Sequence, residues 1–351
     1  MDSSNNDMLV EVNDLHVHFF LHEGTVHAVN GVSFKIRQGS TLGIIGESGS
    51  GKSVTAQALL GILPVPPAKL VAGEILLHAQ TTSGNYEVID LARLSWKGSR
   101  MRSIRGREIA MVFQEPMTSF SPVHTIGEQI MEAVLLHIPG VDAAQARERT
   151  IEMLRRVGIP RPEQRIDAYP HQLSGGMRQR AMIAMALSCN PSLLIADEPT
   201  TALDVTIEAQ ILQLIKDLQQ EFGMAIMYIS HDLAVVGGLA DEVMVMYLGM
   251  VMEYASAEEI FDAPRHPYTR ALWRSIPKID GPMEPLVPIA GAIPSPFSVQ
   301  QGCPFYSRCE ERIPGVCNLT PPPVVEVYPG HMVRCFLYTS EHQVIAQAQR
   351  A

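Results

Sequence analysis

Short apolar runs alternate with longer amphipathic stretches along the first 260 residues of the chain. Three of these runs are rich in β-forming residues, and each ends at a cluster of polar side chains: Thr41–Ile45, Leu193–Ala196 and Ala225–Ile229. Buried strands of parallel sheets have this nearly continuous apolar pattern, and helices connect them. The pattern therefore predicts a mostly parallel α/β sheet with a site where its strands end.

Other segments fit the same architecture. A turn at Gly249 separates two apolar runs and predicts a β-hairpin. Apolar residues recur every three or four positions in two longer stretches, which predicts helices. These further elements are strands over Met8–Val17 and Val32–Ile36, hairpin strands over Val243–Tyr247 and Met250–Glu253, and helices over 142–158 and Ile207–Leu218.

The composition changes near residue 260. The last 91 residues hold 14 of the 25 prolines and four of the five cysteines. Proline interrupts helices and central strands, so long regular elements are not expected there. We predict a small, loop-rich subdomain, because its cysteines and aromatic residues need something to pack around.

Length, charge and composition indicate how many domains the chain has and which classes of function they argue against. The 351 residues carry 27 Lys and Arg against 37 Asp and Glu, a net charge of −10, and 46% are apolar. This length favours two domains, and the acidic balance argues against general nucleic-acid binding, which depends on clustered cations. No membrane-spanning helix and no signal peptide are visible in the sequence. We expect a cytoplasmic chain whose cysteines are thiols or ligands.

The run Thr41–Ile45 leads directly into Gly46–Ser53, which fits the pattern G-x-x-x-x-G-K-[ST]. Glycines in such a phosphate loop let backbone N–H groups surround phosphates at the start of the next helix. Lys52 is expected at the β- and γ-phosphates, and the Ser53 hydroxyl at Mg²⁺. The predicted nucleotide contacts here are Gly46, Ser48, Gly49, Ser50, Gly51, Lys52, Ser53 and Val54.

Two consecutive acidic residues, Asp197 and Glu198, directly follow the apolar run Leu193–Ala196. Beside a phosphate loop, the first can orient Mg²⁺ and its water. The second can take a proton from the attacking water. The loop and the two acids together predict a site that hydrolyses a nucleotide.

Between these motifs lies Leu173–Met177, which reads Leu-Ser-Gly-Gly-Met and precedes a helical pattern. This combination resembles the ABC ATPases, whose signature is LSGGQ. Further family motifs follow the family order, and the resemblance covers roughly residues 8–255. They are Phe19 as the aromatic that stacks on adenine (Phe20 as the alternative), Gln114 of the Q-loop, Asp204 in Ala202-Leu203-Asp204 of the D-loop, and the switch histidine His231.

The resemblance implies a fold and a division of the chain. The fold is α/β: an ABC-type P-loop ATPase domain with a RecA-like mixed sheet core and a helical signature subdomain. This domain would span residues 1–260, with the helical subdomain at about 115–190. Residues 261–351 would form a small Cys- and Pro-rich C-terminal extension.

The resemblance also implies roles for the site residues. Glu198 would act as the base, with His231 and Gln114 positioning water and γ-phosphate. The Mg²⁺ ligands would be Ser53, Gln114 and Asp197, and Asp204 would belong to the ATP contacts. Met177 replaces the family glutamine, which removes a polar contact of that side chain but not the phosphate contacts around it.

In ABC ATPases the signature of one subunit closes over ATP bound to the phosphate loop of another. This chain has one phosphate loop and one signature, so it cannot complete a site alone. The signature residues Ser174, Gly175 and Gly176 would therefore act in trans. We expect a head-to-tail pair with a second ATPase subunit, a heterodimer by family precedent, enclosing two ATP molecules.

Past residue 260, the segments 266–269 (HPYT) and 302–305 (GCPF) resemble the C-terminal extension of ATPase subunits from dipeptide, oligopeptide and nickel importers. This implies two transmembrane permease subunits and an extracytoplasmic solute-binding protein, with the chain on the cytoplasmic face of the inner membrane. Residues around Met117–Val123 would lie near the coupling helices of the permeases. Di- and oligopeptides are the expected cargo, and nickel, opines and oligosaccharides are alternatives.

Cys303, Cys309, Cys317 and Cys335 are separated by 5, 7 and 17 residues. Four thiolates suit zinc or an iron–sulfur cluster, although the spacing lacks close Cys-x-x-Cys pairs and is not a ferredoxin pattern. Some dipeptide-importer ATPases hold a 4Fe–4S cluster in such an extension, so the resemblance implies this cluster, with zinc or free thiols as the alternatives. Cys189 is expected to be a small buried residue.

Two other functions compete with that of an importer subunit. Soluble ABC ATPases that act on DNA or ribosomes usually have coiled-coil insertions, tandem modules or basic surfaces, and the sequence has none of these. A P-loop GTPase needs an Asn-Lys-x-Asp motif, which the sequence lacks, and would not explain Leu173–Met177. Both alternatives are therefore less consistent with the sequence.

Overall fold

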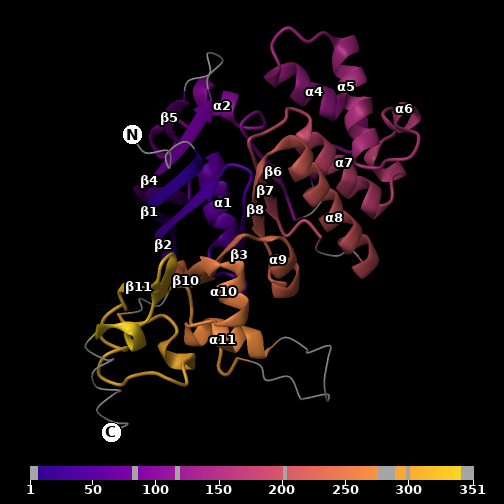
Figure 1. The fold of residues 1–351 in the computed structure, drawn as a ribbon. Coiled ribbons are helices and arrows are strands. Elements are labelled where there is room, and N and C mark those ends of the chain that lie inside the picture. The colour runs from indigo at the N-terminus through magenta and orange to yellow at the C-terminus, as the bar shows by residue number, and fades with distance from the viewer. Residues whose placement is uncertain are drawn as a thin grey trace.

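The computed structural model describes residues 7–80, 86–114, 119–200, 204–275, 289–297 and 301–340. Within these ranges the strands form a four-stranded and an eight-stranded sheet. Figure 1 shows the N-terminal strands in indigo on the left, a group of magenta helices at the upper right, and the orange-to-yellow C-terminal region below.

The larger sheet contains β3 (Thr41–Ile45), β6 (Ile109–Val112), β7 (Leu193–Asp197), β8 (Ala225–Ile229), β9 (Glu242–Tyr247), β10 (Met250–Ser256), β11 (Val324–Tyr328) and β12 (His331–Arg334). The strand order is β11-β12-β10-β9-β3-β8-β7-β6. The strands from β9 to β6 run parallel, and β10, β12 and β11 continue the sheet in antiparallel pairs. The three apolar runs that predicted parallel strands are β3, β7 and β8, and each is buried throughout.

The smaller sheet is antiparallel, in the order β2-β1-β4-β5. Its strands are β1 (Met8–Leu21), β2 (Gly24–Arg37), β4 (Ala68–Gln80) and β5 (Tyr86–Asp90). The predicted strands over Met8–Val17 and Val32–Ile36 are therefore confirmed but too short. β1 and β2 extend together as a ribbon as far as the Leu21–Gly24 pair. The missed parts mix polar and apolar side chains without a regular alternation, and cross-strand backbone hydrogen bonds do not require one.

Ten α-helices in the described residues cover the two sheets: α1 (Lys52–Leu60), α2 (Ser99–Ile104), α4 (Ile126–His137), α5 (Ala143–Arg156), α6 (Pro162–Arg165), α7 (Gly175–Leu187), α8 (Val205–Phe222), α9 (Leu233–Leu239), α10 (Ala257–Asp262) and α11 (Pro267–Arg274). The predicted helices are α5 and α8. Capping boxes start α4 at Thr125 and α5 at Asp142. Among the described residues, no helix has the length and apolar content needed to cross a membrane.

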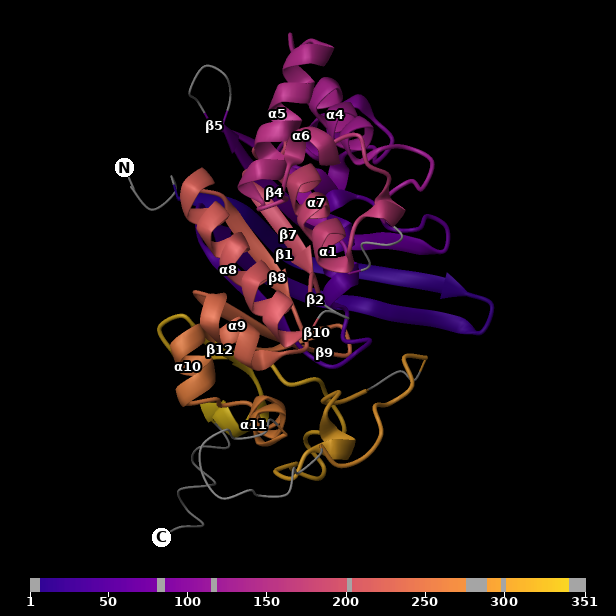
Figure 2. The same cartoon turned by 90° about the vertical axis from the view of Figure 1, so that its right-hand side faces the viewer.

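The large sheet separates two apolar cores. Alternate residues of β8 point to opposite faces. Ile226 and Tyr228 pack with the core that includes α4, α5, α7 and α8, whereas Met227 and Ile229 pack with α1 and the smaller sheet. Figure 2 shows α8 and α9 on one side of the sheet and the long β1–β2 ribbon projecting on the other. Both faces are covered, so the loops after the parallel strands are where polar groups gather.

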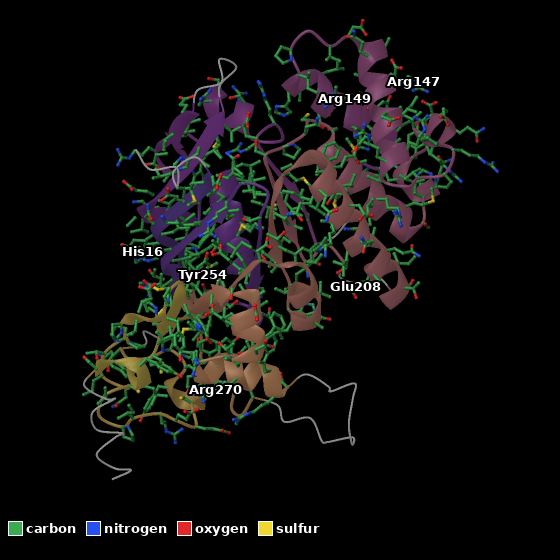
Figure 3. All side chains as sticks on the ribbon, in the orientation of Figure 1. His16, Arg147, Arg149, Glu208, Tyr254 and Arg270 are labelled. Atoms are coloured by element: carbon green, nitrogen blue, oxygen red, sulfur yellow. The ribbon has the colours of Figure 1, made fainter. Side chains whose placement is uncertain are left out.

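The C-terminal extension is rich in loops, and one of its strands joins the larger sheet. Its hairpin β11–β12 pairs with β10, and this hairpin was not predicted. On α11, Arg270 forms an ion pair with Glu311 at 2.8 Å; Figure 3 labels Arg270 where α11 meets the extension. The strand β10 carries the buried acid of the junction, Glu253, whose Oε1 lies 2.8 Å from Nε2 of His331 in β12.

Replacing Glu253 by alanine should lower the free energy of unfolding by about 3–5 kcal/mol, the usual effect of removing one member of a buried pair and leaving its hydrogen-bond partners without an acceptor. Besides His331, its carboxylate accepts hydrogen bonds from the backbone N–H groups of Arg265, at 2.6 Å, and His266, at 2.9 Å. Urea unfolding at neutral pH measures the difference. As a control, Glu310→Ala removes an exposed acid paired with Arg274 and should change stability by about 1 kcal/mol or less.

The same acid makes stability depend on pH. Burial alone would raise the pKa of Glu253, but hydrogen bonds, first among them that of His331, bring this pKa below its ordinary value. A lowered folded-state pKa stabilises the fold above the ordinary carboxyl pKa, and the contribution disappears as pH falls through the folded-state value. The stability difference between wild type and Glu253→Ala should therefore shrink in acid. A difference that grows in acid would contradict this assignment.

Candidate nucleotide site

A cavity of about 300 Å³ lies beyond the carboxyl ends of β3, β7 and β8. It gathers side chains from the phosphate loop with residues that follow three separate strands. The residues that line it are Ser48, Gly49, Ser50, Gly51, Lys52, Ser53, Val54, Gln114, Glu198 and His231. All ten were candidate site residues from the sequence, and the parallel sheet brings them together because their strands end at one edge.

Two glycines of the phosphate loop have no room for a side chain. Gly46 has φ +152°, and a Cβ there would lie 2.2 Å from the carbonyl oxygen of Met246. Gly51 has φ +101°, and its Cβ would lie 2.4 Å from the carbonyl oxygen of Ala28. The loop therefore packs directly on the backbone of β9 at Met246 and of β2 at Ala28. The helix α1 starts at Lys52, beside the cavity. The free N–H groups of a helix N-terminus favour an anion at this position.

Lys52 supplies a buried positive charge at this helix start. Its Nζ donates hydrogen bonds to the carbonyl oxygens of Gly46, at 2.7 Å, and Glu47, at 3.2 Å. Burial lowers the pKa of Lys52, and the carboxylates of Glu198, Asp197 and Glu47 oppose that shift. Ser50 Oγ is buried and has no hydrogen-bond partner among the described residues. A bound phosphate would satisfy both groups.

Ser53 and Asp197 place two oxygen atoms side by side. Ser53 Oγ donates to Asp197 Oδ1 at 3.1 Å. Burial raises the pKa of Asp197, and the hydrogen bond from Ser53 opposes the shift. Hydroxyl and carboxylate oxygens are the ligands that Mg²⁺ prefers, usually in combination with phosphate oxygens. The pair therefore fits a magnesium ion held together with a nucleotide.

Glu198 projects into the cavity between two polar side chains. Its Oε2 accepts a hydrogen bond from Gln114 Nε2 at 3.0 Å and lies 3.3 Å from His231 Nδ1. Glu198 has φ +46°, an uncommon conformation for a non-glycine residue, and its N–H bonds to the carbonyl oxygen of Ile229 at 2.9 Å. Such strain concentrates at functional sites. The carboxylate is thus aimed and held where a general base would act.

Several predicted residues lie away from this cavity. Ser174, Gly175 and Gly176 stand at the N-terminus of α7 and do not line it. Ser174 Oγ caps α7 by accepting from the Met177 N–H at 3.3 Å, and the Met177 side chain packs against the core. Asp204 caps α8 in the same way, with 2.9 Å to the Ile207 N–H.

The two candidate aromatics also lie outside the cavity lining. Phe19 packs against the core beside the smaller sheet, whereas Phe20 is 52% exposed. Consecutive strand residues point to opposite faces, so the two rings are not interchangeable. Some motif positions lie outside the described residues: Glu115 and Pro116 after Gln114, Met117 and Thr118 of the expected permease contact, and Ala202 and Leu203 before Asp204.

Two residues that meet the phosphate loop were missed by sequence reasoning. The Glu47 N–H donates to Tyr268 Oη at 3.0 Å, and the Glu47 carboxylate pairs with Arg308 at 2.6 Å. Tyr268 belongs to the segment 266–269, which was noted only as a family marker. Arg308 is 261 positions from its partner, and nothing in the local sequence connects the two.

The four cysteines of the extension line one cavity of about 10 Å³. They are buried, and burial raises the pKa of Cys303 and Cys335 to about 12 and that of Cys309 to about 11. The space suits one water molecule. No three Cys, His, Asp or Glu residues in the described part of the chain are placed to hold a metal ion. The described structure therefore has no ready-made zinc or cluster site, although it brings the four predicted ligands to one cavity.

Cys189 has the predicted structural role. It is buried next to the C-terminus of α7, and its thiol donates to the carbonyl oxygen of Ala133 at 3.5 Å. Burial raises the pKa of this thiol.

Comparisons with known proteins support the resemblance. Residues 29–201 match the family described as ABC transporter, and residues 252–317 match the oligopeptide/dipeptide transporter C-terminal region. A probable peptide ABC transporter ATP-binding protein of Sinorhizobium fredii is 50% identical over 331 residues, 94% of this chain and 95% of that protein. An oligopeptide transport ATP-binding protein of Bacillus subtilis is 47% identical, covering 95% of this chain and 98% of its own length.

Solved structures confirm the predicted fold class. A dimeric ATP-binding cassette bound to ADP and phosphate has a TM-score of 0.60 and 27% identity, over 71% of this chain and 99% of that one. A component of a Clostridium perfringens ABC transporter complex has a TM-score of 0.59 and 29% identity, over 73% and 92% of the two chains. The chain therefore belongs to the ABC transporter family of transport-coupled ATPases, in the branch whose members carry the oligopeptide/dipeptide transporter C-terminal region.

Proposed function

We propose that this chain hydrolyses MgATP to power the import of di- or oligopeptides. The observation that carries the proposal is the convergence of the phosphate loop, Gln114, Glu198 and His231 on one cavity. The names of the relatives point to peptides as the cargo. Importers of nickel, opines or oligosaccharides remain the alternatives within the branch, and a soluble ATPase is the alternative outside it.

Different residues of the site bind the phosphates, activate water and hold Mg²⁺. Lys52 and the N–H groups at the start of α1 bind the β- and γ-phosphates. Glu198 takes the proton of the attacking water, while Gln114 and His231 hold that carboxylate and orient water and γ-phosphate. Ser53, Asp197 and Gln114 would hold Mg²⁺, which supplies charge neutralisation at the phosphates. Gly46, Ser48, Gly49, Ser50, Gly51 and Val54 line or shape the pocket, and Phe19, or Phe20 as the alternative, would stack on adenine.

A second ATPase subunit completes the site. Ser174, Gly175 and Gly176 are exposed or half-buried at the N-terminus of a 13-residue helix, where backbone N–H groups favour phosphate, yet they lie outside this chain's own cavity. We infer that they close over ATP on the partner subunit, with Asp204 near the same junction. The partner is expected to be a different chain, and two ATP molecules lie between the two.

The proposed assembly also contains two transmembrane permeases and an extracytoplasmic solute-binding protein. The chain would sit on the cytoplasmic face of the inner membrane, with the region Met117–Val123 near the coupling helices of the permeases. The acidic net charge of −10 agrees with the absence of nucleic acid from this assembly. Selectivity for the cargo would then reside in the binding protein and the permeases.

Reconstitution of the full assembly in proteoliposomes tests the function. A radiolabelled dipeptide or oligopeptide should accumulate only with MgATP and the solute-binding protein present. Uptake of nickel or an oligosaccharide in place of peptides would move the chain to another cargo class. Purification of the chain with nucleic acid and without membrane subunits would contradict the importer assignment.

A 4Fe–4S cluster on Cys303, Cys309, Cys317 and Cys335 stays a proposal, with zinc as the alternative. Its support is that all four thiols line one cavity, and the small size of that cavity means that the surrounding segments would have to move apart to admit the cluster. Anaerobically purified protein should contain about four iron atoms per chain, the content of one such cluster. Cys309→Ser should lose this iron, and Cys189→Ser should keep it. Iron-free protein with stoichiometric zinc would favour zinc, and absence of both metals would leave free thiols.

A further inference from the structure

A buried arginine of the C-terminal extension holds the phosphate loop. Arg308 ends the 3₁₀ turn Tyr306–Arg308, and only 3% of its side chain is exposed. Its Nη1 donates to Glu47 Oε2 at 2.6 Å and its Nη2 donates to Glu47 Oε1 at 3.0 Å. This is the two-pronged pairing that fixes both partners in orientation as well as in distance.

The guanidinium itself is immobilised by its surroundings. Nε donates to the carbonyl oxygen of Ala290 at 3.1 Å, and Nη1 also donates to Tyr247 Oη at 3.3 Å. The guanidinium carbon, Cζ of Arg308, lies 5.8 Å from the centre of the Tyr247 ring and 6.0 Å from the centre of the Phe305 ring. The arginine is therefore anchored in the extension and in β9, and the phosphate loop is the part that it restrains.

Glu47 is the point where three restraints meet. The extension holds its carboxylate through Arg308, and α11 holds its backbone N–H through Tyr268. In addition, Lys52 Nζ donates to the Glu47 carbonyl oxygen at 3.2 Å. An incoming phosphate attracts Lys52 away from that carbonyl. The loop then depends on Arg308 and Tyr268 to keep its shape.

We propose that Arg308 is a positioning residue for ATP binding, so that the C-terminal extension is part of the nucleotide site. Its pairing with Glu47 keeps the N–H groups of the phosphate loop in the arrangement that receives phosphates. This inference rests on the proposed binding of ATP at the phosphate loop.

The test uses ATP hydrolysis by the assembled transporter and binding of a fluorescent ATP analogue to the full-length chain. Arg308→Met should raise the KM for ATP about 10- to 100-fold and change kcat less, because a displaced loop weakens binding before chemistry. Arg308→Lys keeps the charge but not the fork and should give a smaller increase. Arg312→Met is the matched control, because Arg312 contacts Cys309 and Tyr306 within the extension and makes no bond to Glu47.

Glu47→Gln removes the same ion pair without entering the extension, and should also raise KM. In the Glu47→Gln background, Arg308→Met should then have little further effect, since the two act through one contact. Additive effects, an unchanged or lower KM in Glu47→Gln, or an equal rise in KM in Arg312→Met would overturn the inference. If wild type fails to bind MgATP, or binds no better than Lys52→Ala, the proposed function fails instead. Normal binding by wild type with no effect of Arg308→Met refutes only the role of Arg308.

Discussion

Replacing Glu198 by glutamine should preserve ATP binding and slow hydrolysis by about 10²- to 10⁴-fold, the usual contribution of a general base. The amide matches the carboxylate in shape and can keep a contact with Gln114 or His231. It cannot take a proton from water. Because Lys52, Ser53 and the backbone of the phosphate loop are untouched, affinity for the nucleotide should change little.

Two measurements separate binding from turnover in this variant. Affinity is measured by equilibrium binding of MgATP to the full-length chain, and turnover by phosphate release from the assembled transporter. Glu221→Gln is a suitable control. Glu221 is a half-exposed acid near the C-terminus of α8, where it pairs with Arg156 of α5, and it does not line the nucleotide cavity. Hydrolysis by Glu198→Gln at close to the wild-type rate would remove Glu198 from the role of base.

Replacing Lys52 by alanine should weaken ATP binding by about 2–5 kcal/mol, the range for losing one member of a buried charge pair. This corresponds to roughly 30- to 5000-fold in affinity. Lys52 is buried, and it is the positively charged residue of the phosphate loop, under the influence of Glu198 and Asp197. Without it, those carboxylates and the phosphates would repel one another.

Titration calorimetry with MgATP measures this loss directly. Lys216→Ala is the matched control, since Lys216 is exposed on α8 and away from the phosphate cavity. A Lys52→Ala chain that binds ATP as tightly as wild type would show that the cavity is not the nucleotide site. The prediction is thus independent of the assignment of Glu198, which concerns turnover alone.

The sequence predicted most reliably the elements whose local pattern is enforced by burial on both sides. β3 and β8 have the predicted bounds, and β7 is longer by one residue, because a strand covered on both faces must be apolar throughout. β1 and β2 are longer than predicted, and β11 and β12 were not predicted. β11 is an edge strand with alternating exposure beside three consecutive prolines, so its pairing with β12 depends on partners that the sequence does not reveal.

The candidate site divides in the same way. The phosphate loop, Asp197 and Glu198 could be named from the sequence because they form local motifs that follow apolar strands. Gln114 and His231 were named through the resemblance to the ABC ATPases. Which of them touch could not be read there. The contact of Gln114 with Glu198 and that of Ser53 with Asp197 depend on three strands ending at one edge. Similarly, the four cysteines are visible in the sequence, but the closed cavity that they line is visible only in the structure.

The sequence by itself determined the chemistry of this protein: a glycine-rich loop, a lysine, two acids and a signature in the order of the ABC family. Short-range patterns suffice for this, because backbone conformation and helix capping depend on neighbouring residues. Only the tertiary structure decided that the C-terminal extension extends the ATPase sheet through β12 and reaches the phosphate loop through Arg308. Such contacts join residues far apart in the chain, and their free energy exists only once both sides are folded and water is excluded.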